Sequence, residues 1–197
     1  MFKKKRAMTL IELLISMILM SLVLLGFFSI DSFSRHHVVS SDKRAKVQNE
    51  ISYAIEYMSK YVQQGIGNFS NPPITIYPTS GAQTGFRVRV DLNNPKTATD
   101  LTDDTWINFY LDGTALKTSG GTTETLSEKI VGAFVTEIMP ESPAGGFYVT
   151  ITDPGAAQGM AVDIGLVGRY NPAVAASPDN PQVSMKTRLI CPSSSAQ

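Results

Sequence analysis

The feature that constrains this chain most is an uninterrupted apolar run from Met8 to Ile30. As an α-helix, these 23 residues would extend about 35 Å, slightly more than the ~30 Å hydrocarbon core of a bilayer. Four consecutive cations precede the run: Lys3, Lys4, Lys5 and Arg6. The pattern therefore predicts one membrane-spanning helix, with the basic flank in the cytoplasm and the rest of the chain on the other side.

Glu12 is the only ionisable residue in this run. A carboxylate within a membrane helix is costly, and such residues usually serve a function. One alternative is that Glu12 simply extends to the lipid headgroups near the end of the helix. A lone anchor gains nothing from such a residue, whereas a polymer of several copies can pair the carboxylate with a cation of a neighbour. The second interpretation is favoured.

The order of a small residue, Met-Thr-Leu-Ile-Glu and a long apolar helix resembles the N-terminus of type IV prepilins and pseudopilins. The matching residues are Ala7, Met8, Thr9, Leu10, Ile11 and Glu12. The resemblance implies that prepilin peptidase cleaves between Ala7 and Met8 and methylates the new amino terminus at Met8. It also implies that Glu12 pairs with the amino terminus of a neighbouring subunit during assembly.

The sequence departs from that family at two positions. Ala7 stands where the family usually has Gly, and Met8 stands where it usually has Phe. A small residue lets a protease approach the backbone closely, and Ala adds only one methyl group. We therefore expect cleavage at a reduced rate.

A secretory signal that is removed whole is disfavoured, because the run is about twice the usual length of a signal-peptide apolar region.

Composition limits the remaining chain to one domain of moderate size. Of 197 residues, about 130 follow the long helix, enough for a single core.

The chain has 17 basic and 17 acidic residues, so removing the four leader cations leaves a net charge of −4. A general nucleic-acid binder needs surplus cations, so the charge argues against that class. No intramolecular disulfide can form, because Cys191 is the only cysteine.

No pattern in the sequence indicates an enzyme. The chain lacks a Gly-rich phosphate loop, a G-x-S-x-G elbow and an H-E-x-x-H motif. The two histidines, His36 and His37, are adjacent, so on a helix they point about 100° apart and make a poor pair of metal ligands. We expect a non-enzymatic protein without a catalytic residue or cofactor.

Residues 31–65 predict an amphipathic continuation of the helix. There is no Pro or Gly from Asp31 to Gln64, and Gly65 and Gly67 supply a helix stop. The apolar residues recur at spacings of three, four and seven, which mark one helical face: Val47, Ile51, Ala54, Ile55, Met58, Tyr61 and Val62.

Residues 66–191 predict a β-rich head. A Pro- and Gly-rich loop over 68–85 precedes alternating strands, which we place at 86–92, 105–111, 114–117, 147–152, 160–170 and 183–190. Asp112-Gly113 predicts a tight turn, 119–123 a flexible segment, and 126–138 fits either a helix or a strand. Residues 192–197 predict a disordered tail. The fold class is α+β and pilin-like: one long N-terminal helix packed on an antiparallel sheet of about four to six strands.

A calcium site is an alternative that the sequence leaves open. Oxygen-bearing side chains crowd the loops between the first two predicted strands: Asp91, Asn93, Asn94, Asp100, Asp103 and Asp104. Their spacing matches no EF-hand, and solvated acidic loops are common. The favoured interpretation is therefore a protein without a metal.

The leading functional hypothesis is a structural subunit of a type IV pilus or a type II secretion pseudopilus. The larger minor pilins and J-type minor pseudopilins resemble the later half in the order of the helix, the hairpin at 107–117 and the strand at 160–170. The resemblance implies an inner-membrane protein with a periplasmic head, with prepilin peptidase, other subunits and assembly platform proteins as partners. The alternative is a single-pass membrane-anchored binding domain that does not polymerise.

Overall fold

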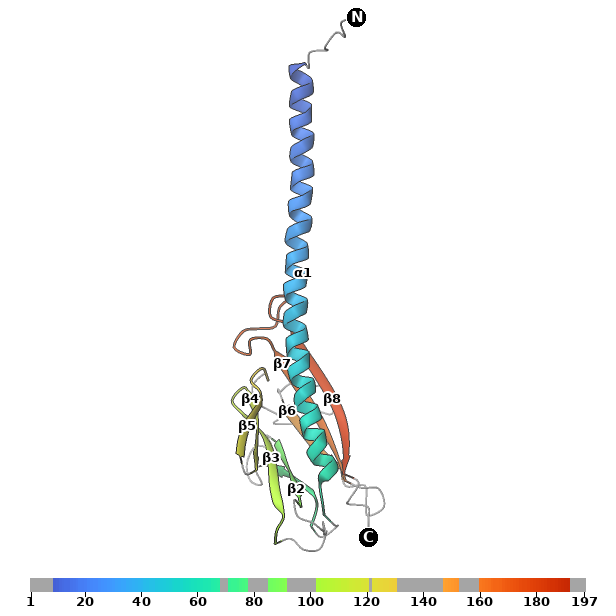
Figure 1. Cartoon of the computed structure of the whole chain (residues 1–197), viewed down its shortest axis with the longest axis vertical. Helices are drawn as coiled ribbons and strands as arrows, with labels where there is room; N and C mark the ends of the chain where they lie inside the picture. The colour runs from blue at the N-terminus through green and yellow to red at the C-terminus, as the bar shows by residue number, and fades with distance from the viewer. Residues whose placement is uncertain are drawn as a thin grey trace, which may run out of the picture. The chain divides into compact units, whose positions relative to one another are not determined.

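The computed structural model describes residues 9–67, 71–77, 85–91, 102–120, 122–130, 147–152 and 160–191. The chain divides into two compact units, Met1–Ser41 and Asp42–Gln197. One helix, α1 (Leu10–Gln64), runs through both units, as the long run without Pro or Gly after Asp31 predicts (Figure 1).

In the first unit, α1 is apolar on every side from Leu13 to Ile30, apart from three serines. From Leu10 to Val39 every residue is exposed, and this helix has the length and hydropathy to cross a membrane. Its serine hydroxyls donate to carbonyls one turn back: Ser16 to Glu12, Ser21 to Ile18 and Ser29 to Leu25. These bonds satisfy the hydroxyls within the helix, so the serines add little cost in a lipid environment.

In the second unit, the same helix buries a single stripe. The five fully buried residues lie at the predicted helical spacing: Val47, Ile51, Ala54, Met58 and Val62. Ile55 and Tyr61, the other two predicted positions, are partly buried beside them. The predicted face is therefore confirmed, and it forms the helix side of one shared hydrophobic core.

The first sheet contains five antiparallel strands in sequence order. They are β1 (Ile74–Tyr77), β2 (Gly85–Val90), β3 (Thr105–Asp112), β4 (Ala115–Gly120) and β5 (Thr122–Ser127). The predicted turn joins β3 to β4, where Asp112 pairs with Ala115 and Gly113 has a φ of 62° that favours glycine.

Two sequence-based predictions about this sheet were wrong. The predicted loop over 68–85 contains β1, whose Ile74 pairs with Val88 and is 1% exposed. The predicted flexible segment 119–123 contains the end of β4 and the start of β5. In both places, pairing with a neighbouring strand outweighs the local Pro, Gly and Ser content.

The second sheet contains three antiparallel strands, β6 (Phe147–Thr152), β7 (Met160–Arg169) and β8 (Gln182–Cys191). The described residues thus form eight strands in two sheets, where the sequence suggested a single sheet of four to six. The ambiguous segment 126–138 begins as the end of β5, and Ile130 then bridges Gly168 of β7. The chain passes from one sheet to the other here, and residues 131–138 lie outside the described part.

Two glycines let the helix approach the sheets closely. A Cβ on Gly168 would lie 2.8 Å from Ile51 Cδ1, so β7 passes directly beneath the buried stripe. A Cβ on Gly65 would lie 3.0 Å from Cys191 Sγ and 3.1 Å from Val88 Cγ1. The end of α1 therefore sits against both β2 and β8. Cys191 is fully buried there.

Candidate assembly site at the start of the apolar helix

Glu12 is fixed in place by a reciprocal cap with Thr9. The Glu12 backbone N–H donates to Thr9 Oγ1 at 3.3 Å, and the Thr9 backbone N–H donates to Glu12 Oε2 at 3.0 Å. The Thr9 hydroxyl also lies 3.0 Å from the same carboxylate oxygen and donates to it. This is a capping box, in which two otherwise unsatisfied backbone donors at a helix start are paired.

Thr9 belongs to this site, although the sequence analysis assigned it no role of its own. The signal was present, because Thr9-Leu10-Ile11-Glu12 has the S/T-x-x-E spacing that precedes apolar helices. The cap explains why α1 begins at Leu10. It also holds the carboxylate in one orientation against the positive end of the helix dipole.

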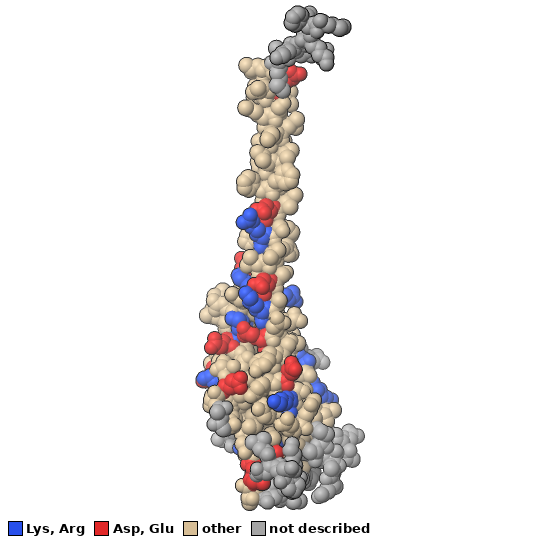
Figure 2. Space-filling view, in the orientation of Figure 1, with Lys and Arg blue, Asp and Glu red and all other residues tan. Residues whose placement is uncertain are grey.

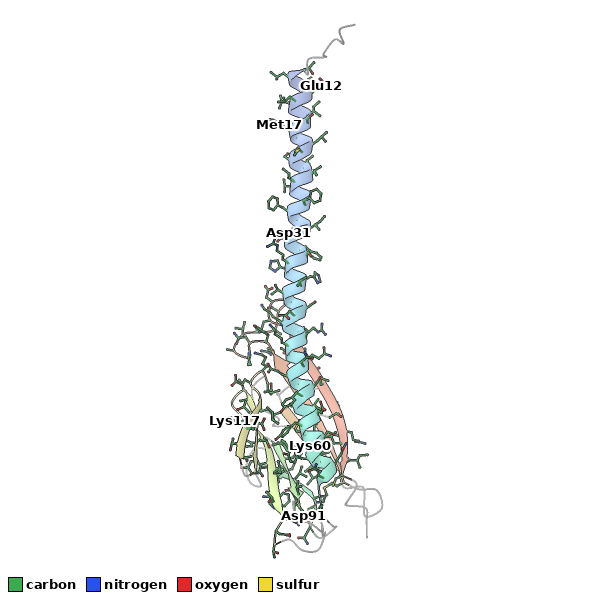
Figure 3. All side chains as sticks on the ribbon, in the orientation of Figure 1. Glu12, Met17, Asp31, Lys60, Asp91 and Lys117 are labelled. Atoms are coloured by element: carbon green, nitrogen blue, oxygen red, sulfur yellow. The ribbon has the colours of Figure 1, made fainter. Side chains whose placement is uncertain are left out.

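The surroundings of Glu12 are apolar along a long stretch of helix. Leu10 is 80% exposed and Ile11 66% exposed, and the next ionisable residue is Asp31. Figure 3 shows Glu12 at the N-terminal end of α1 and Asp31 far along it. Figure 2 shows only uncharged residues on the visible surface between the two. Among the described residues, none donates to the second oxygen, Oε1. The site can therefore accept a further donor or cation.

The remaining predicted site residues lie outside the described part of the chain. These are the leader cations Lys3, Lys4, Lys5 and Arg6, and the cleavage residues Ala7 and Met8. Cleavage after Ala7 and methylation of Met8 therefore stay predictions from the sequence.

The two histidines lie on the exposed surface of α1, beyond the apolar run. The ring of His37 packs edge-on against Phe33 with the centroids 4.6 Å apart, and Arg35 forms an ion pair with Asp31 at 2.9 Å. In the described ranges, neither histidine belongs to a group of three potential metal ligands. The arrangement is that of a polar helix surface.

Three of the residues considered for calcium do come together. Asp91, Asp103 and Asp104 each offer an oxygen within 4.8 Å of the others. Figure 3 shows Asp91 at the far end of the β-rich head. Asn93, Asn94 and Asp100 lie outside the described residues.

Arg89 already provides a positive charge to this acidic group. Its Nε lies 3.4 Å from Asp104 Oδ2, and both side chains are almost fully buried. Burial lowers the pKa of Arg89, whereas the charge of Asp104 raises it. Arg89 also donates to the carbonyls of Ile66 and Asn71, which ties β2 to the chain after the helix. The expectation of a protein without a metal stays a prediction, and calorimetry of the full chain with added calcium tests the alternative of a calcium site.

The comparison with protein families concerns the start of the chain. Residues 2–28 match the model of the prokaryotic N-terminal methylation motif. The searches of curated proteins and of solved structures found no match. The start of the chain thus carries the prepilin-type signature, which supports a likeness to type IV pilins and pseudopilins. Proteins with this signature are structural, and the apolar helix fits a membrane-anchored pilin.

Proposed function

We propose that this chain is a minor structural subunit of a bacterial type IV pilus or type II secretion pseudopilus. In this proposal prepilin peptidase removes residues 1–7 and methylates Met8. The mature chain stays in the inner membrane through α1 until assembly platform proteins move it into a filament. The basic leader fixes the N-terminus in the cytoplasm, which places the β-rich head in the periplasm.

The observation that carries the proposal is the oriented carboxylate of Glu12 in an otherwise apolar helix. Cleavage before Met8 would create a positive amine four residues away from it. Within one chain, the cap with Thr9 already uses Oε2. A neighbouring subunit that brings its Met8 amine to Glu12 would pair two charges that are each costly in lipid. That pairing would also fix the axial register between the two helices.

The alternative is a membrane-anchored binding domain that does not polymerise. Such a protein needs the cations and the apolar run but has no use for Glu12. The two functions differ at the N-terminus, because only the first requires cleavage after Ala7.

Mass spectrometry of the mature protein, purified from membranes of a host that contains prepilin peptidase, separates them. The filament subunit is expected to begin with N-methylated Met8, and an Ala7→Leu variant is expected to keep the leader because a bulky residue blocks the protease. An intact leader beginning at Met1 in the unaltered protein would instead establish the anchored domain.

A further inference from the structure

The outer face of the first sheet carries aromatic and polar side chains. The inner face packs on α1 (Figure 1), where Tyr57 and Tyr61 of the helix contact the ring of Phe109 in β3. Side chains alternate along a strand, so the neighbours of Phe109 point to the opposite face. The half-buried residues of that face in the first three strands are Thr75, Tyr77, Arg87, Trp106, Asn108 and Tyr110. Neither the prepilin signature nor the proposed assembly site uses this face.

Two tyrosines form an apolar surface on this face. Gly85 of β2 pairs with Tyr77 on one side and with Tyr110 on the other. The two tyrosines are thus two strand spacings apart, about 9.5 Å along the sheet, yet their ring centroids lie within 5.7 Å. The rings therefore lean toward each other across Gly85, which has no side chain. Such a ring pair can pack against the C–H face of a sugar ring.

Arg87 lies beside the tyrosine pair and is held in position. Its guanidinium lies 4.3 Å from the ring centroid of Trp106, and its Nε donates to Thr75 Oγ1 at 2.8 Å. In the part of the chain that the structure describes, none of the ion pairs includes Arg87. A half-buried guanidinium without a carboxylate favours an anionic ligand, and its two terminal nitrogens can donate to both oxygens of one carboxylate.

Asn108 lies between the aromatic and the cationic groups. It pairs with Arg87 across β2 and β3, and it is two residues from both Trp106 and Tyr110. Its Nδ2 donates to Ser119 Oγ at 3.1 Å, which orients its carbonyl oxygen as an acceptor for a hydroxyl group. From Trp106 to Tyr110 the strand extends about 13 Å. The face thus offers a surface for ring stacking, a neutral acceptor and a cation within that length.

An acidic oligosaccharide matches these three features together. It has apolar ring faces, hydroxyl groups and carboxylates at regular intervals. Single-stranded nucleic acid also stacks on aromatic rings, but it carries a phosphate at every nucleotide and binds grooves rich in cations. Here Arg87 is the one cation of the six residues, and the chain without its leader has a net charge of −4. The competing explanation is that these side chains only stabilise the sheet through cross-strand contacts.

We propose that the outer face of β1 to β3 binds an acidic oligosaccharide. One sugar ring packs on Tyr77 and Tyr110, and the carboxylate of a sugar accepts hydrogen bonds from Arg87. This binding uses neither Met8 nor Glu12, so it does not depend on cleavage or filament assembly.

The fluorescence of Trp106 tests the proposal, because Trp106 is the only tryptophan of the chain and contacts Arg87. The full chain in nonionic detergent is titrated with a hexamer of galacturonic acid, which is expected to give a saturable change. The matched control is the fully methyl-esterified hexamer, which has the same sugar rings without the charge. It is expected to bind about tenfold more weakly. A six-nucleotide thymidine oligomer tests the nucleic-acid alternative and is expected to bind more weakly than the acidic sugar.

Substitutions separate the charge from the ring surface. Arg87→Gln should weaken binding of the acidic hexamer about tenfold and leave binding of the ester unchanged, whereas Arg169→Gln in the second sheet should change neither. Arg87→Lys keeps the charge and should retain part of the preference for the acid, which provides a test if the glutamine variant folds poorly. Tyr110→Ala should weaken binding of both hexamers, whereas Tyr53→Ala, at an exposed tyrosine of α1, should not.

Four results would overturn the proposal. They are a titration without any saturable change, equal affinity for the acid and the ester, an unchanged preference in Arg87→Gln, and tighter binding of the thymidine oligomer than of the acidic hexamer.

Discussion

From Leu10 to Ser41 every residue of α1 except Ser40 is exposed, whereas from Asp42 to Gln64 one stripe is completely buried. The backbone is the same continuous helix in both parts, so the difference lies in the side chains. The first part has apolar residues on all sides up to Ile30, and that stretch suits a lipid or helical environment. The second part has one apolar stripe and suits a sheet. A single helix can therefore serve two environments when its periodicity changes along its length.

The largest expected effect comes from making the same substitution in each part. Ile51→Ala should lower the free energy of unfolding of the head by about 2–5 kcal/mol, because Ile51 is fully buried and its removal leaves a cavity. Ile18→Ala, at a residue 55% exposed, should leave head stability unchanged. Urea unfolding of the full chain in detergent measures both variants. Equal losses would show that the two parts of α1 do not differ as described.

The second prediction concerns Glu12, the only ionisable residue of the apolar run from Met8 to Ile30. Glu12→Ala should insert into the membrane normally but enter filaments roughly a hundredfold less, since an unpaired charge at membrane depth costs about 3 kcal/mol. Comparing membrane and filament fractions by immunoblot measures the effect. Ser16→Ala, which loses only a hydroxyl bonded to the Glu12 carbonyl, should assemble like the unaltered protein. Unimpaired incorporation of Glu12→Ala would contradict the proposed role.

A smaller effect is expected from the cap that orients Glu12. Thr9→Ala removes the hydroxyl partner of the Glu12 backbone and should destabilise the first turn by about 1 kcal/mol. Filament entry should fall to a level between those of Glu12→Ala and the unaltered chain. Thr9→Ser retains the hydroxyl and serves as the control. If Thr9→Ala and Thr9→Ser assembled equally well, the cap would have no part in assembly.

The smallest effect concerns an ion pair in the second part. The hydrogen bonds from Arg188 hold the pKa of Asp163 below its ordinary value. A lowered folded-state pKa means that the pair stabilises the fold above about pH 4 and that this contribution is lost as pH falls through the lowered pKa. Because Arg188 is 61% exposed, the loss should be under about 1 kcal/mol.

Unfolding of the Asp163→Asn variant at neutral and acidic pH measures this contribution. The variant should be less stable at neutral pH and should lose less stability on acidification than the unaltered chain. Arg188→Lys keeps the charge but not the two-bond geometry, so it should give an intermediate result. A pH dependence that is the same with and without Asp163 would argue against the pair.

Some of the fold could be predicted because the signal is local. The buried stripe of α1 follows from residues three and four apart. The β3–β4 hairpin follows from Asp112-Gly113, and β8 follows from the alternation of Val183, Met185 and Leu189. The strand β1 could not be predicted in this way, because its stability comes from pairing with β2 across a segment rich in Pro and Gly.

The site residues, like the fold, include some that a local sequence signal identifies and some that it does not. Glu12 stands out in the sequence as one charge in an apolar run, and Thr9 lies at a recognisable capping distance from it. In contrast, the contact of Arg89 with Asp104 joins residues on either side of a long connection. Sequence spacing alone placed acids near one another there but did not identify the arginine between them.

The sequence by itself determined the long helix, the two environments of its two parts and the one face that is buried in the head. It could do so because hydropathy and helical periodicity are properties of residues that are close together in the sequence. Only the tertiary structure decided that the described strands form two sheets and that β8 stands last in the order of the second one. Those features depend on hydrogen bonds between segments far apart in the chain, whose partners no local pattern specifies.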